Sequence, residues 1–170
     1  MALRKIIYLP DVRLRQPNAP IHQFDENLQT LIQDMFDTMY HAQGVGLAAP
    51  QIGINLQLSV IDVIGDKSNQ IVLVNPEIIA KSGEVVCSEG CLSVPSAYDK
   101  LTRAETVTVR AQDRYGKPFE MTASDLLGQC FQHEIDHLNG TLFIDHLSSL
   151  KKAIARRKLD KFKRRKPASS

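Results

Sequence analysis

The sequence lacks both the long apolar runs of membrane proteins and the cysteine spacing of secreted ones. No stretch approaches the roughly 18 apolar residues needed to cross a bilayer. The apolar part of the first ten residues is too short for a signal peptide, and no small-residue cleavage site follows it. The three cysteines, Cys87, Cys91 and Cys130, are an odd number without a disulfide-framework pattern. We therefore expect a cytoplasmic protein with no membrane association, whose cysteines are free thiols or metal ligands.

Internal repeats and low-complexity segments are also missing, apart from one basic stretch near the C-terminal end. The length of 170 residues, with 43% hydrophobic and 24% charged residues, is that of one ordinary globular domain. The charge is uneven: residues 151–166 carry ten Lys or Arg and one acid, whereas residues 1–150 carry eleven Lys or Arg and eighteen acids. Such a basic run is often only a solvated helix end, but its contrast with the acidic body favours contact with a polyanion.

Periodicity predicts helices near both ends of the chain and strands between them. The first helix begins after Asp25 and runs to about Gln43, the second covers about 125–139 after Ser124, and the third begins near Ser148. Segments rich in Val, Ile and Leu predict strands at 56–64, 71–75, 77–80, 84–88, 105–111 and 118–122. Because the strands are consecutive, the class is α+β, with mostly antiparallel strands around the helix at 125–139, an N-terminal helix and a basic C-terminal helix.

The helix at 125–139 carries the sequence His133-Glu-Ile-Asp-His137, which matches H-E-x-x-H. Histidines four residues apart lie on one helical face, so both imidazoles can bind one ion, and the glutamate between them can reach a bound water. In a chain with five histidines and seven glutamates, roughly 0.006 such matches are expected by chance. The motif therefore predicts that this helix binds a metal ion.

A third ligand must come from elsewhere in the chain. One metalloprotease pattern extends to H-E-x-x-H-x-x-G-x-x-H, and this chain follows it to Gly140 but has Phe143 at the last position. Asp145 and His146 lie nearby, but beyond the end of the helix, so they are weaker candidates. Cys91 is better placed, in Glu89-Gly-Cys-Leu-Ser-Val-Pro95 after a predicted strand, although an isolated cysteine is more often a small buried hydrophobe. One thiolate and two imidazoles suit Zn²⁺ and also Fe²⁺.

Three segments stand together in this chain, and as a set they are specific: Gly44-Val-Gly-Leu-Ala-Ala-Pro-Gln-Ile-Gly53, Glu89-Gly-Cys-Leu-Ser93 and Gln132-His-Glu-Ile-Asp-His137. In these segments the chain resembles the peptide deformylases of the bacterial type, from about residue 3 to beyond residue 147. The resemblance implies a metal-dependent hydrolase that removes the formyl group from the N-terminal formylmethionine of newly made polypeptides. It also divides the chain into a catalytic part, 1–147, and a basic C-terminal helix and tail, 148–170.

The resemblance assigns roles to individual residues. It implies Cys91, His133 and His137 as metal ligands, with Glu134 as the general base and Gln51 and the backbone N–H of Leu92 as the oxyanion hole. The ion would be Fe²⁺, with Zn²⁺, Ni²⁺ or Co²⁺ able to take the same ligands. The implied substrate-binding residues are Gly44, Val45, Gly46, Glu89, Leu126, Gln129 and Cys130. An apolar residue is expected at position 129, so the polar Gln129 departs from the family pattern.

Two other functions use the same motif. The first is another metal-dependent amidase or peptidase, which the phenylalanine at position 143 and the Cys91 motif disfavour. The second is a non-catalytic domain held together by a metal ion, whose basic segment binds RNA. For a deformylase, the segment 151–166 would instead dock on ribosomal RNA near the nascent-chain exit. Nothing in the sequence demands more than a monomer, and the native metal is not fixed by it.

Overall fold

The structure, a computed structural model, describes residues 3–165, so Lys166 and the rest of the predicted tail lie outside the described part. Three α-helices are present: α1 (Glu26–His41), α2 (Asp125–Leu138) and α3 (Ser149–Arg165). The strands are β1 (Gly46–Ala48), β2 (Leu58–Ile61), β3 (Ile71–Ser82), β4 (Val85–Cys91), β5 (Val94–Arg103), β6 (Thr106–Gln112) and β7 (Pro118–Ser124). Short 3₁₀ turns are η1 (Val12–Leu14), η2 (Ala49–Ile52) and η3 (Phe143–His146). None of the helices described is both long and apolar enough for a membrane span.

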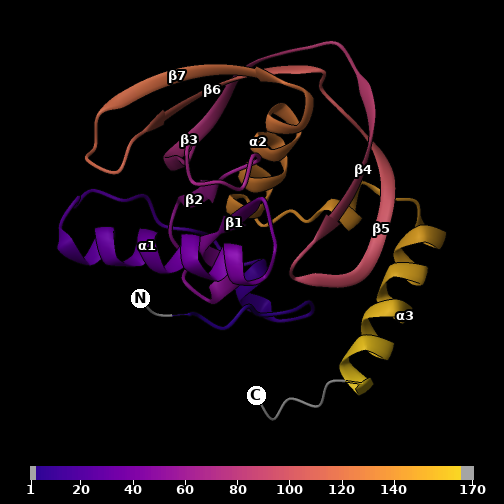
Figure 1. Cartoon of the computed structure of the whole chain (residues 1–170). Helices are drawn as coiled ribbons and strands as arrows, with labels where there is room; N and C mark the ends of the chain where they lie inside the picture. Colours follow the sequence, from indigo (N-terminus) through magenta and orange to yellow (C-terminus); the bar gives the residue numbers. More distant parts are fainter. Residues whose placement is uncertain (1–2, 166–170) are drawn as a thin grey trace.

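The strands form two sheets around α2 (Figure 1). Five strands pair in the order β1-β2-β3-β6-β7, and β4 pairs with β5 in a separate hairpin; every pairing between named strands is antiparallel. Helix α2 contacts all five strands of the larger sheet, and α3 packs along β5. This confirms the predicted α+β fold with antiparallel strands around a central helix.

The predicted helix ends are largely confirmed, with two differences. Asp25 caps α1, because its side chain accepts a hydrogen bond from the Leu28 N–H. Beyond α1, the left-handed residue is Gln43, at φ 60°, rather than the glycine that follows it. Ser124 precedes α2, but its hydroxyl bonds to Thr106 on the neighbouring strand instead of capping the helix. Gly140 follows α2 at φ 76°, as expected for a glycine that ends a helix.

The strand predictions missed β1 and β5. Strand β1 lies inside the glycine-rich segment 44–53, where no strand was predicted, and it is continued by η2. Strand β5 has few apolar residues, since it presents only Val94, Ala97, Leu101 and Arg103 to the interior. The two predicted strands 71–75 and 77–80 are one strand, β3, which bends where Asn75 adopts φ 51°. The Asn75 side chain bonds the backbone of Ile21 on both sides, which fixes this bend.

The apolar face of α2 holds the site in place. Phe131, Ile135 and Leu138 are buried, and Leu127 packs against the same cluster as Phe131 and Ile135, so these residues form one apolar stripe along the helix. The opposite face, with His133 and His137, looks towards the end of the β4–β5 hairpin. The fold therefore brings the two histidines on α2 and Cys91 on β4 to one place.

Candidate metal centre

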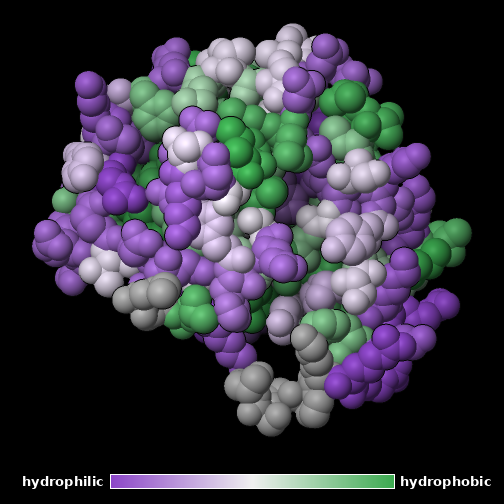
Figure 2. Space-filling view, in the orientation of Figure 1, coloured by the Kyte–Doolittle hydropathy of each residue, from purple (hydrophilic) through white to green (hydrophobic). Residues whose placement is uncertain are grey.

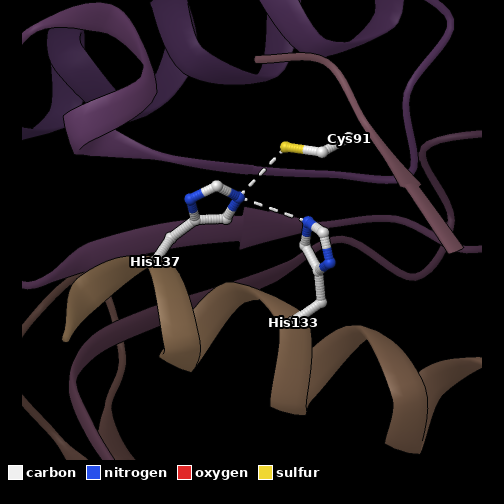
Figure 3. A group of neighbouring side chains, drawn as sticks. All are labelled: Cys91, His133 and His137. Carbon is white, nitrogen blue, oxygen red and sulfur yellow. Dashed lines mark hydrogen bonds between the residues drawn. The ribbon is translucent and has the colours of Figure 1, made fainter. Parts of the chain in front are cut away.

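Cys91, His133 and His137 form a cluster in which all ligand atoms lie within 4.8 Å of one another (Figure 3). Cys91 is the last residue of β4, and the histidines lie one turn apart on α2. The His137 Nε2 lies 3.2 Å from the Cys91 Sγ and 3.2 Å from the His133 Nε2. Among the described residues, this is the group of three or more potential ligands that can hold a metal ion.

These separations fit a tetrahedral ion. Bonds of about 2.0–2.1 Å from zinc to histidine nitrogen give a nitrogen–nitrogen edge of about 3.3 Å, close to the separation between the two Nε2 atoms. Both imidazoles direct Nε2 towards the sulfur, so three donors converge and a fourth position is left for water or substrate. The three residues therefore fit a catalytic metal site.

A buried ion pair orients His133. Glu89 accepts two hydrogen bonds from Arg103, at 2.7 and 2.8 Å, and lies 2.9 Å from the His133 Nδ1. Burial alone would raise the pKa of Glu89, but the hydrogen bonds from Arg103 and His133 outweigh it and lower the pKa to about 2. Because an ionised carboxylate can only accept, Nδ1 carries the proton and the Nε2 lone pair faces the metal site.

The same arginine extends the network towards the surface. Arg103 donates to Asp136 at 2.7 Å, and Asp136 lies 2.9 Å from the His146 Nε2. His146 is thereby tied to Asp136, and Asp145 pairs with Arg15. Neither residue belongs to the metal cluster, in agreement with their low rank as third ligands. Phe143, at the position of a third histidine in the metalloprotease pattern, is buried and stacks on the His133 ring.

Glu134 lies beside the cluster, with its Oε2 4.0 Å from the His133 Nε2. The side chain is buried, and within residues 3–165 its Oε1 has no hydrogen-bond partner. Burial raises the pKa of this carboxyl to about 7, although His133 opposes the shift. A buried carboxyl group that gains and loses its proton near neutral pH, with one oxygen unpaired, is suited to proton transfer.

Gly46 on β1 leaves room for this carboxylate, because a Cβ at position 46 would lie 2.6 Å from the Glu134 Oε2. We expect Gly46→Ala to lower kcat by about 10²-fold, since a misplacement of about 1 Å in a reacting group can cost that much. Steady-state turnover of the formylated peptide that the sequence resemblance implies as substrate checks this, with metal content measured on the same sample.

Gly44→Ala serves as the comparison. A Cβ at position 44 would lie 2.8 Å from the Cδ1 at the flexible end of Leu92, which can move, so its loss in kcat should be clearly smaller. Equal losses of kcat in the two variants would contradict the role of Gly46 in leaving room for the Glu134 carboxylate.

Gln51 is held at the cluster from two sides. Its Oε1 accepts a hydrogen bond from the Ala48 N–H at 2.9 Å, which leaves its Nε2 pointing at the Ser93 Oγ, 3.2 Å away, and the Cys91 Sγ, 3.6 Å away. The side chain is therefore a fixed N–H donor beside the metal ligands. Such a donor is what an oxyanion hole requires.

The cluster opens into a cleft of about 540 Å³. Its lining includes every expected substrate-binding residue, two of the three metal ligands, Glu134, and both residues expected to form the oxyanion hole. In chain order these are Gly44, Val45, Gly46, Gln51, Glu89, Cys91, Leu92, Leu126, Gln129, Cys130, His133 and Glu134. Glu89 can contribute only its backbone to the cleft, because both carboxylate oxygens are engaged by Arg103 and His133. The polar Gln129 has a structural explanation, since its Nε2 donates to the Ser88 carbonyl at 3.0 Å and so joins α2 to β4.

Sequence reasoning missed two residues that shape the site, Arg103 and Ser93. No sequence signal marks Arg103, which lies opposite Val85 in the β4–β5 hairpin, and only the structure shows that its guanidinium reaches Glu89. Ser93 is the last residue of the motif Glu89-Gly-Cys-Leu-Ser93. It is fully buried, and its hydroxyl accepts a hydrogen bond from the Gln51 side chain. The only sequence signal for Ser93 was its place next to Cys91.

A Cys/His/His cluster beside a buried glutamate, at the base of a cleft in an α+β fold, defines a metal-dependent hydrolase of the H-E-x-x-H type. The family model for polypeptide deformylase matches residues 3–153. A peptide deformylase of Chromobacterium violaceum is 52% identical over 161 residues, which cover 95% of this chain and 96% of that protein. The crystal structure of a peptide deformylase from Legionella pneumophila has a TM-score of 0.97 at 65% identity and covers 99% of this chain and 100% of that one. Peptide deformylase 1B of Arabidopsis thaliana has a TM-score of 0.88 at 41% identity, over 95% and 91% of the two chains.

The chain belongs to the polypeptide deformylase family, whose members are metal-dependent enzymes that remove N-formyl groups from nascent peptides. This confirms the function predicted from the three motifs. The family membership decides against the two alternative functions, a metal-dependent peptidase and a non-catalytic metal-binding domain.

Proposed function

We propose that Cys91, His133 and His137 hold the ion and that Glu134 is the general base of deformylation. When bound, the ion lowers the pKa of a water molecule and polarises the formyl carbonyl. Glu134 takes a proton from the attacking water and later delivers it to the departing α-amine. The convergence of three donors beside a buried carboxylate with an unpaired oxygen is the observation that carries this proposal.

Gln51 and the backbone N–H of Leu92 bind the carbonyl oxygen as negative charge develops on it. The position of the Gln51 amide is fixed by Ala48 before substrate arrives, so no reorganisation is needed during the reaction. The methionine side chain lies in the apolar part of the cleft between Val45, Leu126 and Cys130. Burial raises the pKa of the Cys130 thiol to about 12, so it stays neutral and acts there as an apolar surface.

We expect Cys91→Ser to lose most of the bound metal and most of the activity, because a serine hydroxyl is a much weaker ligand than a thiolate. Fe²⁺ is the proposed ion, because the family resemblance implies it and one thiolate and two imidazoles can bind it. The protein is purified without air, its metal content is determined, and formate release from formyl-Met-Ala-Ser is measured on the same sample. About one Fe²⁺ per wild-type chain is the expected result.

Cys87→Ser is the matched control, because Cys87 lies on the same strand and has no place in the cluster. It should keep both metal and activity. Unchanged metal content in Cys91→Ser would refute Cys91 as a ligand, and wild-type protein holding Zn²⁺, Ni²⁺ or Co²⁺ in place of iron would refute Fe²⁺.

We place the enzyme in the cytoplasm as a monomer, where it meets nascent chains, and propose that α3 docks on ribosomal RNA. Ala155 and Leu159 bury one face of α3 against the body of the protein. Arg156, Arg157 and Lys161 are exposed on the remaining surface, which is strongly hydrophilic in Figure 2. Exposed basic side chains on one helix can contact successive phosphates, which makes the binding depend on salt.

Replacing Arg156, Arg157 and Lys161 with glutamine should weaken binding to ribosomes and reduce the slope of log K against log salt by about one for each phosphate that is no longer bound. Co-sedimentation with ribosomes at several salt concentrations measures this. Lys117→Gln, an exposed change in the turn between β6 and β7, is the control and should leave the slope unchanged. Ribosome binding that survives deletion of residues 151–170, or that shows no salt dependence, would disprove docking through this segment.

A further inference from the structure

The cleft continues beyond the residues that the formyl group and methionine require. Its lining also includes Ile6 and Tyr8 from the N-terminal segment and Phe162 from the last turns of α3. These residues come from opposite ends of the chain and have no part in the chemistry described above. Together with Leu92 and Pro95, which line the same cleft, they give it additional apolar and aromatic surface.

The N-terminal segment is held in an extended form that turns Tyr8 into the cleft. The Ile7 N–H donates to the Gln51 carbonyl at 2.8 Å, and the Leu9 N–H donates to the Ser93 carbonyl at 3.0 Å. Ile7 and Leu9 are buried in the core, so by alternation Ile6 and Tyr8 face the other way. The acceptors are Gln51 itself and Ser93, two residues after Cys91, so the N-terminal segment is fixed relative to the metal site.

Helix α3 supplies the other ring. Ala155 and Leu159 are buried, and Phe162, three residues further on, continues the same helical face to the edge of the cleft. The Phe162 ring meets the Tyr8 ring edge to face, with 5.6 Å between centroids and 73° between planes. Both rings stay partly exposed, so together they form an aromatic surface that a ligand can contact.

We propose that the Tyr8–Phe162 pair is a subsite for an apolar or aromatic side chain located beyond the second residue of the substrate. The inference rests on the proposed binding of the formyl end at Cys91, His133 and Glu134. The occupant is the nascent peptide itself, because its chain must leave a cleft whose apolar lining runs on to these two rings. A cleft of about 540 Å³ has the size of sites that hold a ligand of several residues rather than one side chain.

The test uses formyl-Met-Ala-Ala-Ala-Ala and three versions of it that carry Phe at position three, four or five. Formate release gives kcat/KM for each peptide. An aromatic pair contributes enough to change kcat/KM by about three- to tenfold, so phenylalanine at one of these positions should give that gain over alanine. The gain should appear in KM, since the contact is made equally before and during the reaction.

Phe162→Ala and Tyr8→Ala should each reduce this gain to within about twofold of unity. Because the gain is a ratio of two peptides within one variant, any general loss of stability or turnover cancels. Tyr8→Phe keeps the ring and should keep the gain, whereas Phe162→Leu keeps an apolar contact for α3 but should lose most of it. Leu150→Ala removes an exposed apolar side chain from the first turn of α3, far from the cleft lining, and should change nothing.

Two outcomes overturn the subsite: no gain from phenylalanine at any of the three positions, or a gain that persists in both Phe162→Ala and Tyr8→Ala. If phenylalanine gains nothing while the all-alanine peptide is still deformylated, only the subsite is wrong. If no peptide releases formate, the proposed site itself fails, and the subsite fails with it.

Discussion

Glu134→Gln is expected to lower formate release by about 10²–10⁴-fold while the bound metal stays at the wild-type level. Glutamine keeps the shape of the side chain but cannot take a proton from water. The carboxylate lies beside His133 and lines the cleft, so its removal takes the proton acceptor away from the place where the attacking water would stand. The measurement is formate release from formyl-Met-Ala-Ser by protein purified without air, with metal analysis of the same sample.

Glu77→Gln is the matched control for this variant. Glu77 lies on β3, its carboxylate is largely exposed, and its only described ion pair is the long contact with Arg110. The control should retain wild-type activity. Substantial turnover by metal-loaded Glu134→Gln would show that another group acts as the base, whereas loss of metal would assign Glu134 to the ligand set instead.

Arg103→Leu should lower the free energy of unfolding by about 3–5 kcal/mol, because it leaves the buried carboxylate of Glu89 without its partner. For a chain of this length that corresponds to a fall in melting temperature of about 6–20 °C. The variant should also bind metal more weakly, since Glu89 would no longer be held against the His133 Nδ1. Urea unfolding and metal analysis measure the two effects.

Arg110→Leu provides the comparison, since Arg110 makes two ion pairs on the exposed face of β6. Surface pairs are screened by water, so this loss should stay below about 1 kcal/mol. If the two variants were destabilised equally, burial of the Glu89–Arg103 pair would have no energetic consequence, and the orienting role of Arg103 would be wrong.

The parts of this protein that sequence reasoning predicted are those that local spacing determines. The four-residue step from His133 to His137 already places both rings on one face, and the Asp25 cap and Gly140 are likewise local signals. Cys91 lies on a different element, so its local sequence only ranked it above Asp145 and His146, and the resemblance to a known family then implied it as the third ligand. That choice agrees with the cluster seen in the structure.

The parts that were missed depend on pairings between distant segments. Strand β5 carries too few apolar residues to be recognised alone, because it is held by hydrogen bonds to β4 and by α3. Without β5, nothing indicates that Arg103 reaches Glu89. The contact between Tyr8 and Phe162 joins the two ends of the chain, which no spacing rule can predict.

The two halves of the proposed metal site belong to separate parts of the fold. Cys91 lies at the turn of the β4–β5 hairpin, whereas both histidines lie on the helix that packs on the larger sheet. An ion held by all three ligands closes the loop of chain from residue 91 to residue 133, much as a disulfide bond would. Because it binds the folded chain and not the unfolded one, it also adds to the free energy of unfolding. An ion bound by these three ligands would therefore also be a cross-link, and the hairpin should be the first element to open its backbone hydrogen bonds when the ion is removed.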